Sequence, residues 1–198
     1  MALTRATIAP ASVAEEARIA AAMASRFCAA LASADADGGL KNFLDKSRAE
    51  LVELNGGAAR AGAVGEDWIA VSRALCRVGD ELAAAAGDMA NWSVAPERFT
   101  LRLAKLLQAM LGKTAETLAS FGPRAQSGLV QAKADGMELQ AVFRRARGAA
   151  LESERAVESL KLREVFRRLS EAGAAADKAV EGLAWILAEG ERGGGRAH

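Results

Sequence analysis

The 198-residue chain has the length of one domain or of two closely packed halves, and its composition is that of a folded, helical protein. Apolar residues make up 51% and charged residues 26%, which excludes an intrinsically disordered chain. Tyrosine is absent and aromatic residues amount to only 5%, so residues that favour β-strands are too sparse for a sheet protein. The 26 basic and 25 acidic residues are intermixed, whereas a protein dedicated to binding nucleic acid carries a basic stripe.

Two arginine-rich groups, at 144–147 and 167–168, come closest to a basic patch, and we interpret them as solvated helix faces. No charge-free apolar segment reaches the roughly 18 residues that a membrane span needs. The only cysteines, Cys28 and Cys76, lie on or beside apolar helical stripes, so we predict reduced thiols in a cytoplasmic protein. Residues 1–10 lack the pattern of a signal peptide.

Composition divides the chain into three parts. Residues 1–11 are expected to form a flexible N-terminus, and the Gly- and Arg-rich residues 190–198 a disordered tail. Residues 12–189 are expected to form one helical bundle domain, with possible halves at 12–92 and 93–189.

The first two predicted helices span 13–33 and 40–54. Ser12 and Glu15 form a capping box before the first helix, in which apolar residues then recur every four positions. The second helix is predicted to stop at the Asn-Gly-Gly sequence at 55–57, because Asn and Gly tolerate the left-handed conformation of a helix end.

The third helix has the clearest pattern, an unbroken apolar heptad of the coiled-coil kind over 68–89. The Asn-Trp-Ser sequence at 91–93 closes this helix, and Pro96 is expected at an early position of the fourth. The fourth helix carries an apolar face and is predicted to end at the Gly-Pro pair at 122–123.

The fifth helix, 125–153, has a weaker stripe that three glycines interrupt, and the sixth, 160–189, has a second long heptad. Small residues at 172–176 predict that another helix approaches closely there. The fold class is therefore predicted as all-α, a six-helix bundle of two antiparallel three-helix units. Seam positions predicted to be buried are Trp68, Leu75, Leu82, Leu103, Met110, Phe166, Leu169 and Leu183.

The third and sixth helices align when one is shifted by 94 residues. The alignment places apolar positions and glycines of the two heptads on one another: Trp68 on Leu162, Val71 on Val165, Leu75 on Leu169, Gly79 on Gly173 and Leu82 on Ala176. A duplication of a three-helix half explains this register, and so does chance, since any two heptads align in some register.

Catalytic chemistry finds little support in the sequence. The only histidine is His198, at the end of the chain, which excludes Ser-His and Cys-His nucleophile systems and disfavours a zinc site. The Glu-x-x-His motif of di-iron bundles and the phosphate-binding P-loop are both missing. We therefore expect a protein that is not an enzyme and has no cofactor.

Three segments of the chain resemble a known family: 66–75 with Asp80 and the alanines that follow it, 162–169, and 177–183. They resemble the PhoU-like phosphate-transport regulators, and more narrowly the branch that accompanies Pit-type phosphate transporters. The resemblance implies a PhoU-like helical bundle that acts as a regulatory partner of phosphate uptake. It also implies acidic motifs on the bundle surface that can hold metal clusters.

Several of those acidic positions are changed in this chain. Cys76 and Arg77 replace the two aspartates expected before Asp80, and the acidic pair of the last helix falls on Ser170 and Ala174. The acids that the resemblance leaves for a divalent or trivalent metal are Asp80 and Asp177, with Glu171 and Glu181 nearby in the sequence. We expect no strong metal binding, because Arg77 would put a positive charge where the metal would sit.

The resulting expectation is a cytoplasmic regulator or adaptor of inorganic phosphate uptake that works by protein–protein contact. Its partner would be a membrane phosphate transporter or a signalling partner of that transporter, with neither nucleic-acid binding nor membrane insertion, and a homo-oligomer is left open. The alternative is a phasin-like or other structural helical coat protein, which Ala-rich amphipathic helices also fit. A coat protein exposes one long apolar face, whereas a regulator of this kind buries its six stripes against one another.

Overall fold

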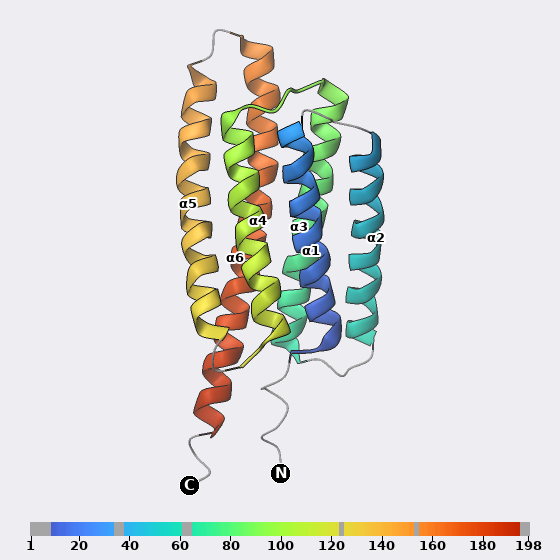
Figure 1. Cartoon of the computed structure of the whole chain (residues 1–198), viewed down its shortest axis with the longest axis vertical. Coiled ribbons are helices and arrows are strands. Elements are labelled where there is room, and N and C mark those ends of the chain that lie inside the picture. The colour runs from blue at the N-terminus through green and yellow to red at the C-terminus, as the bar shows by residue number, and fades with distance from the viewer. Residues whose placement is uncertain (1–8, 34–37, 61–64, 123–124, 153–154, 195–198) are drawn as a thin grey trace.

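The computed structural model describes residues 9–33, 38–60, 65–122, 125–152 and 155–194, and these form a bundle of six helices (Figure 1). Helices account for 92% of the described residues, which contain no strand. The helices are α1 (Ala11–Ser33), α2 (Gly38–Arg60), α3 (Glu66–Trp92), α4 (Arg98–Ala119), α5 (Ala125–Leu151) and α6 (Ala156–Gly194). The all-α, six-helix prediction is confirmed.

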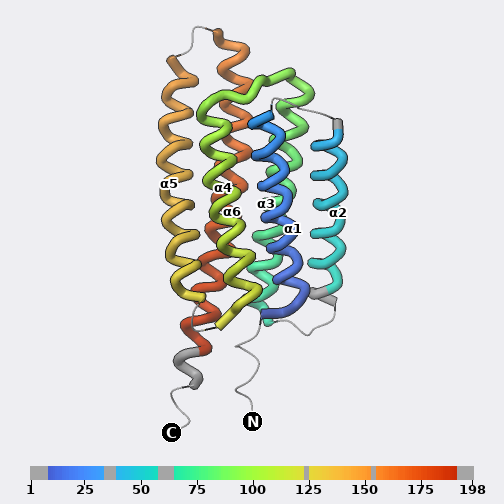
Figure 2. The backbone as a smooth tube through the Cα atoms, in the orientation of Figure 1, coloured from blue at the N-terminus to red at the C-terminus, as the bar shows by residue number. Residues whose placement is uncertain are grey.

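Two three-helix units make up the bundle. Helices α1, α2 and α3 contact one another, and so do α4, α5 and α6. The units meet where α3 packs along α6 and α1 packs along α4, while α2 and α5 are the outermost helices on opposite sides (Figures 1 and 2). Successive helices run in opposite directions, up and down the bundle (Figure 2). The predicted boundary between the halves, between residues 92 and 93, falls where α3 ends and the connection to α4 begins.

The core confirms the heptad reading. All eight seam residues predicted from the third, fourth and sixth helices are buried: Trp68, Leu75, Leu82, Leu103, Met110, Phe166, Leu169 and Leu183. Burying a leucine or phenylalanine side chain contributes about 1.5–3 kcal/mol, so these residues supply much of the driving force for packing the bundle. Just beyond α4, Phe121 lies edge-on to Trp68, with ring centroids 5.2 Å apart.

Small residues in α6 allow the close approach that was predicted at 172–176. A Cβ atom on Gly173 would lie 2.6 Å from Cδ2 of Leu139 in α5, which is too short for any real Cβ contact. The neighbouring alanines at 172, 175 and 176 are also buried. Helices α5 and α6 therefore pack closely at this level because α6 presents almost no side-chain bulk.

Two helix ends differ from the sequence prediction. Helix α2 does not stop at 55–57 but continues to Arg60, because the Asn55 side chain faces α3 and donates to Ser72 Oγ at 2.6 Å. This contact comes from a distant part of the chain, so local propensity could not reveal it. Helix α6 starts at Ala156 and continues through residues 190–194. These five residues were predicted to belong to a disordered tail, and they are helical. Residues 1–8 and 195–198 lie outside the described residues.

The predicted helix starts are also adjusted. The capping box is wrong, because α1 begins at Ala11 and the Pro10 carbonyl accepts from the Val13 and Ala14 N–H groups. Glu15 instead pairs with Arg18, whose Nε lies 2.7 Å away. Pro96, expected at an early position of the fourth helix, lies before it: α4 begins at Arg98, and its N-cap is Glu97, whose carboxylate accepts from the Thr100 N–H at 2.9 Å.

Candidate functional site on helices α3 and α6

Arg168 of α6 lies at the centre of a charged face where α6 packs along α3. Its guanidinium contacts Glu81 and Asp88 of α3, each at 3.3 Å, and Glu164 one turn earlier in α6 at 3.4 Å. The side chains of Glu81 and Asp88 are only 13% and 19% exposed, so these carboxylates are partly removed from water. Partial burial strengthens an ion pair but also makes an unpaired partner costly.

Two further ion pairs extend this face across three helices. Arg77 of α3 contacts Glu171 of α6 at 3.0 Å, and Arg48 of α2 contacts Asp80 of α3 at 2.5 Å. All of these side chains are more than a third exposed, so water screens the pairs and each adds little to stability. Their consequence is geometric: arginines from α2, α3 and α6 are held on the carboxylates of the same surface.

The four acids predicted as metal ligands do not form one group. Asp80 pairs with Arg48 and Glu171 pairs with Arg77. Only Asp177 and Glu181 are brought together, through Lys133 of α5, whose ammonium donates to them at 2.8 and 2.6 Å. Within the described ranges, no group of three or more His, Cys, Asp or Glu side chains lies close enough to hold a metal ion.

Lys133 remains a cation in this arrangement. Partial burial of the ammonium lowers its pKa, but hydrogen bonds and charge from Asp177 and Glu181 outweigh that effect and leave the pKa raised. Arg77, which was expected to place a positive charge beside Asp80, instead neutralises Glu171. Each of the four predicted acids thus forms an ion pair with a lysine or arginine, as surface carboxylates commonly do.

A buried carboxyl group that the sequence reading missed lies in the first unit. Glu16 of α1 has no exposed surface, and the Ser72 hydroxyl of α3 donates to its Oε1 at 2.8 Å. The Asn55 amide of α2 donates in turn to Ser72, so one hydrogen-bonded chain joins all three helices. Burial raises the pKa of Glu16, and its other oxygen, Oε2, has no hydrogen-bond partner within the described part of the chain. The sequence did contain a sign of this burial, because Glu16 precedes Met23 by two helical turns and so lies on the apolar face of the first helix.

The two cysteines are free thiols, as predicted. The Cys76 thiol donates to the Leu51 carbonyl at 3.3 Å, and burial, followed by the charges of Glu16 and Asp80, raises its pKa to about 12. Burial also raises the pKa of Cys28. A thiol with a raised pKa carries almost no thiolate at neutral pH, so neither cysteine is suited to nucleophilic chemistry.

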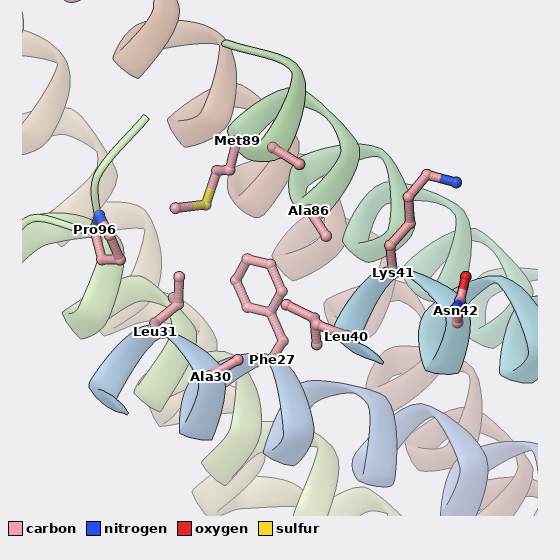
Figure 3. Close-up of a pocket in the computed structure, with 10 residues that line it drawn as sticks. Phe27, Ala30, Leu31, Leu40, Lys41, Asn42, Ala86, Met89 and Pro96 are labelled. Carbon is pink, nitrogen blue, oxygen red and sulfur yellow. The ribbon is translucent and has the colours of Figure 1, made fainter. Parts of the chain in front are cut away.

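An apolar cavity of about 300 Å³ opens at the end of the bundle where α1, α2, α3 and the segment before α4 meet. Figure 3 shows the Phe27 ring in the middle of its lining, with Leu40 and Met89 near it and the Lys41 ammonium directed away. Lys41 pairs with Asp45 at 2.7 Å rather than facing the cavity. The cavity therefore offers apolar contact to a ligand and directs no acid–base group into its interior.

Comparison with known proteins identifies the fold. No protein-family model matches the sequence, and no curated protein matches it. Among solved structures, the chain is similar to PhoU from Pseudomonas aeruginosa, with a TM-score of 0.68 and 17% sequence identity. The similarity covers 89% of this chain and 93% of that one. The architecture is thus a PhoU-like helical bundle, as the resemblance implied. No helix in the described ranges is long and apolar enough to cross a membrane.

Proposed function

We propose that this protein is a cytoplasmic regulator of inorganic phosphate uptake that acts by contact with another protein and catalyses no reaction. The observation that carries the proposal is the similarity to PhoU over nearly the full length of both chains. The sequence resemblance at 66–80 and 162–183 adds the narrower assignment to the branch that accompanies Pit-type transporters. The partner is then a membrane phosphate transporter or its signalling protein.

The charged face of α3 and α6 supports a regulator that works without a metal cluster. Acids such as Asp80, Glu81 and Glu171 are held by Arg48, Arg168 and Arg77 instead of being left to gather a cation. Arginine forks fix carboxylates in place, so the surface keeps one shape without a bound ion.

An exposed apolar stripe on α5 is the surface best suited to a protein partner. Val130 and Met137 are seven residues apart, on the same helix face, and each is 68% exposed. The next position of this heptad is the exposed Arg144, and the one after it is Leu151, which is 61% exposed. Helix α5 is an outermost helix that contacts only α4 and α6 in the described structure. Exposed apolar residues at heptad spacing on an outer helix, here with one arginine among them, are a pattern that a partner helix recognises.

Regulation through such a contact requires the partner to have two states. The bundle shifts the transporter toward the state that it binds more tightly, and equal affinity for both states would shift nothing. The near-neutral net charge of +1 gives little long-range attraction, so affinity must come from the contact itself.

Deleting the gene tests the proposal. Phosphate uptake and stored phosphate would be measured in starvation and in excess, in the deletion strain and after complementation. Wild-type protein should restore normal handling, whereas the Val130→Asp/Met137→Asp variant should not, although it should fold. Gln131→Asp, which adds one negative charge at an exposed position beside the stripe, is the control and should complement. A deletion strain with normal phosphate handling, together with protein that pellets with storage granules, would replace this proposal by the phasin-like one.

A further inference from the structure

The arginine groups interpreted from sequence as solvated helix faces are drawn together by the fold. Arg147 of α5 and Arg163 and Arg167 of α6 line a single cavity of about 410 Å³ between these two helices. The rest of the lining comes from Phe143, Leu160, Glu164 and Phe166. The cavity thus combines positive charge from two helices with an apolar wall, although its residues are distant in sequence.

Two of the three arginines have no carboxylate partner in the described part of the chain, so their charge can attract an anionic ligand. Arg167 donates to both oxygens of Glu164, at 2.9 and 2.6 Å, and this bond lowers the pKa of Glu164, so that pair is internally neutralised. Neither Arg147 nor Arg163 forms an ion pair with a carboxylate in the described residues. Arg163 is also partly buried, so it is held more closely to the cavity than a fully exposed arginine would be.

The apolar wall is firmly held. Phe166 is 2% exposed and packs edge-on against Phe99, with ring centroids 6.4 Å apart. Phe143 packs against the core from α5. A ligand in this cavity would therefore meet the partly exposed Phe143 side chain together with the arginines of the lining.

We propose that this cavity binds a phosphorylated small molecule that carries a planar ring, such as a nucleoside diphosphate. Guanidinium forks match phosphate oxygens in pairs, and the partly exposed Phe143 ring offers a surface on which a base can stack. The volume lies within the roughly 300–1,000 Å³ typical of small-ligand sites. A ligand here would bridge α5 and α6, and this site stands independently of any contact with a transporter.

Isothermal titration calorimetry on the full chain tests the site, with ADP as the probe and with adenosine and inorganic phosphate as separate arms. ADP should bind, and each half alone should bind at least about tenfold more weakly, because each fills only one side of the cavity. The double variant Arg147→Ala/Arg163→Ala should weaken ADP binding by about tenfold or more, since each substitution removes a charged contact.

The matched control is Arg26→Ala/Arg145→Ala, which removes the same charge from exposed positions outside the cavity and should change ADP binding less than about twofold. Circular dichroism checks that both variants fold. Absence of ADP binding, or equal weakening by the two double variants, would overturn the site. Inorganic phosphate that binds as tightly as ADP would overturn the role of the aromatic wall and with it the nucleotide.

Discussion

Gly79 of α3 and Gly173 of α6 occupy equivalent positions in the two units, and each faces a buried leucine of the helix that precedes its own. A Cβ atom on Gly79 would lie 2.6 Å from Leu51 Cδ1, and one on Gly173 would lie 2.6 Å from Leu139 Cδ2. The shift that aligns the two heptads in the sequence therefore also aligns two close helix contacts. Equivalent packing in both units favours a duplicated three-helix half over a chance alignment.

Alanine substitutions at three glycines should separate close packing from helix propensity. Gly173→Ala should destabilise the protein by about 1–3 kcal/mol, because Cδ2, Cδ1 and Cγ of Leu139 all lie within 3.4 Å of the new methyl group. Gly79→Ala should cost less, since only the flexible end of Leu51 lies that close. Gly87→Ala, in open space on α3, should stabilise by about 0.5–1 kcal/mol. Urea denaturation measures all three, and a Gly173→Ala protein as stable as Gly87→Ala would contradict the close contact.

Truncation of Leu75 tests the buried stripe of α3. Leu75 has no exposed surface, so Leu75→Ala should lower the free energy of unfolding by about 2–5 kcal/mol through lost burial and the cavity left behind. Leu151→Ala serves as the control, because Leu151 is exposed and its loss should change stability by less than about 0.5 kcal/mol. Equal effects of the two substitutions in thermal or urea unfolding would refute the packing.

The apolar periodicity carried most of the fold prediction. The heptads of the third and sixth helices identify the residues that face each other, and small residues at 172–176 identify the level of closest approach. These features are local, because helix geometry fixes which residues share a face. The end of α2 was missed because its determinant, the Asn55–Ser72 hydrogen bond, joins residues from two helices.

The candidate site was predicted less well for the same reason. The sequence identifies Asp80 and Glu171 as acids but not that Arg48 and Arg77 reach them from other helices. Likewise, the arginine groups at 144–147 and 167–168 are far apart in the sequence, and only the packing of α5 along α6 brings Arg147 and Arg167 to one cavity. Long charged side chains form ion pairs with residues of neighbouring helices, and residue spacing within one helix does not predict which residues those are.

Replacing Arg168 should reveal how much the charged face contributes. Arg168→Met keeps the apolar stem but leaves Glu81 and Asp88 partly buried without their cation, so we expect a loss of about 1–3 kcal/mol, between exposed and buried ion pairs. Arg167→Met, at a more exposed neighbour that pairs with Glu164, should cost less than about 1 kcal/mol. Both are measured by urea unfolding at low salt. If the two variants lose equal stability, Arg168 is not the centre of this face.

Metal content is predicted to be low. Protein purified without chelator should contain less than about one tenth of an equivalent of iron, zinc or nickel by elemental analysis, because basic side chains already neutralise the four candidate acids. Treatment with a chelator should then leave the melting temperature unchanged. Stoichiometric metal that Asp177→Asn/Glu181→Gln removes would show that Lys133 gives way to a cation at that pair.

The buried Glu16 should give the protein a distinctive dependence of stability on pH. Burial raises its pKa in the folded state above the ordinary value of 4.5, so the folded protein holds a proton that the unfolded chain releases. The stability that this proton contributes is complete below about pH 4.5 and is lost as the pH rises toward the folded-state pKa. Glu16→Gln removes the ionisation, so the variant should gain stability relative to wild type as the pH rises through this window.

Glu15→Gln is the control at the adjacent, exposed residue, whose pKa is lowered by its hydrogen bond to Arg18 and whose contribution has the opposite sign. Free energies of unfolding measured by urea from about pH 5 to pH 8 decide the matter: a difference between Glu16→Gln and wild type that does not change with pH would mean that Glu16 titrates as an ordinary carboxyl group.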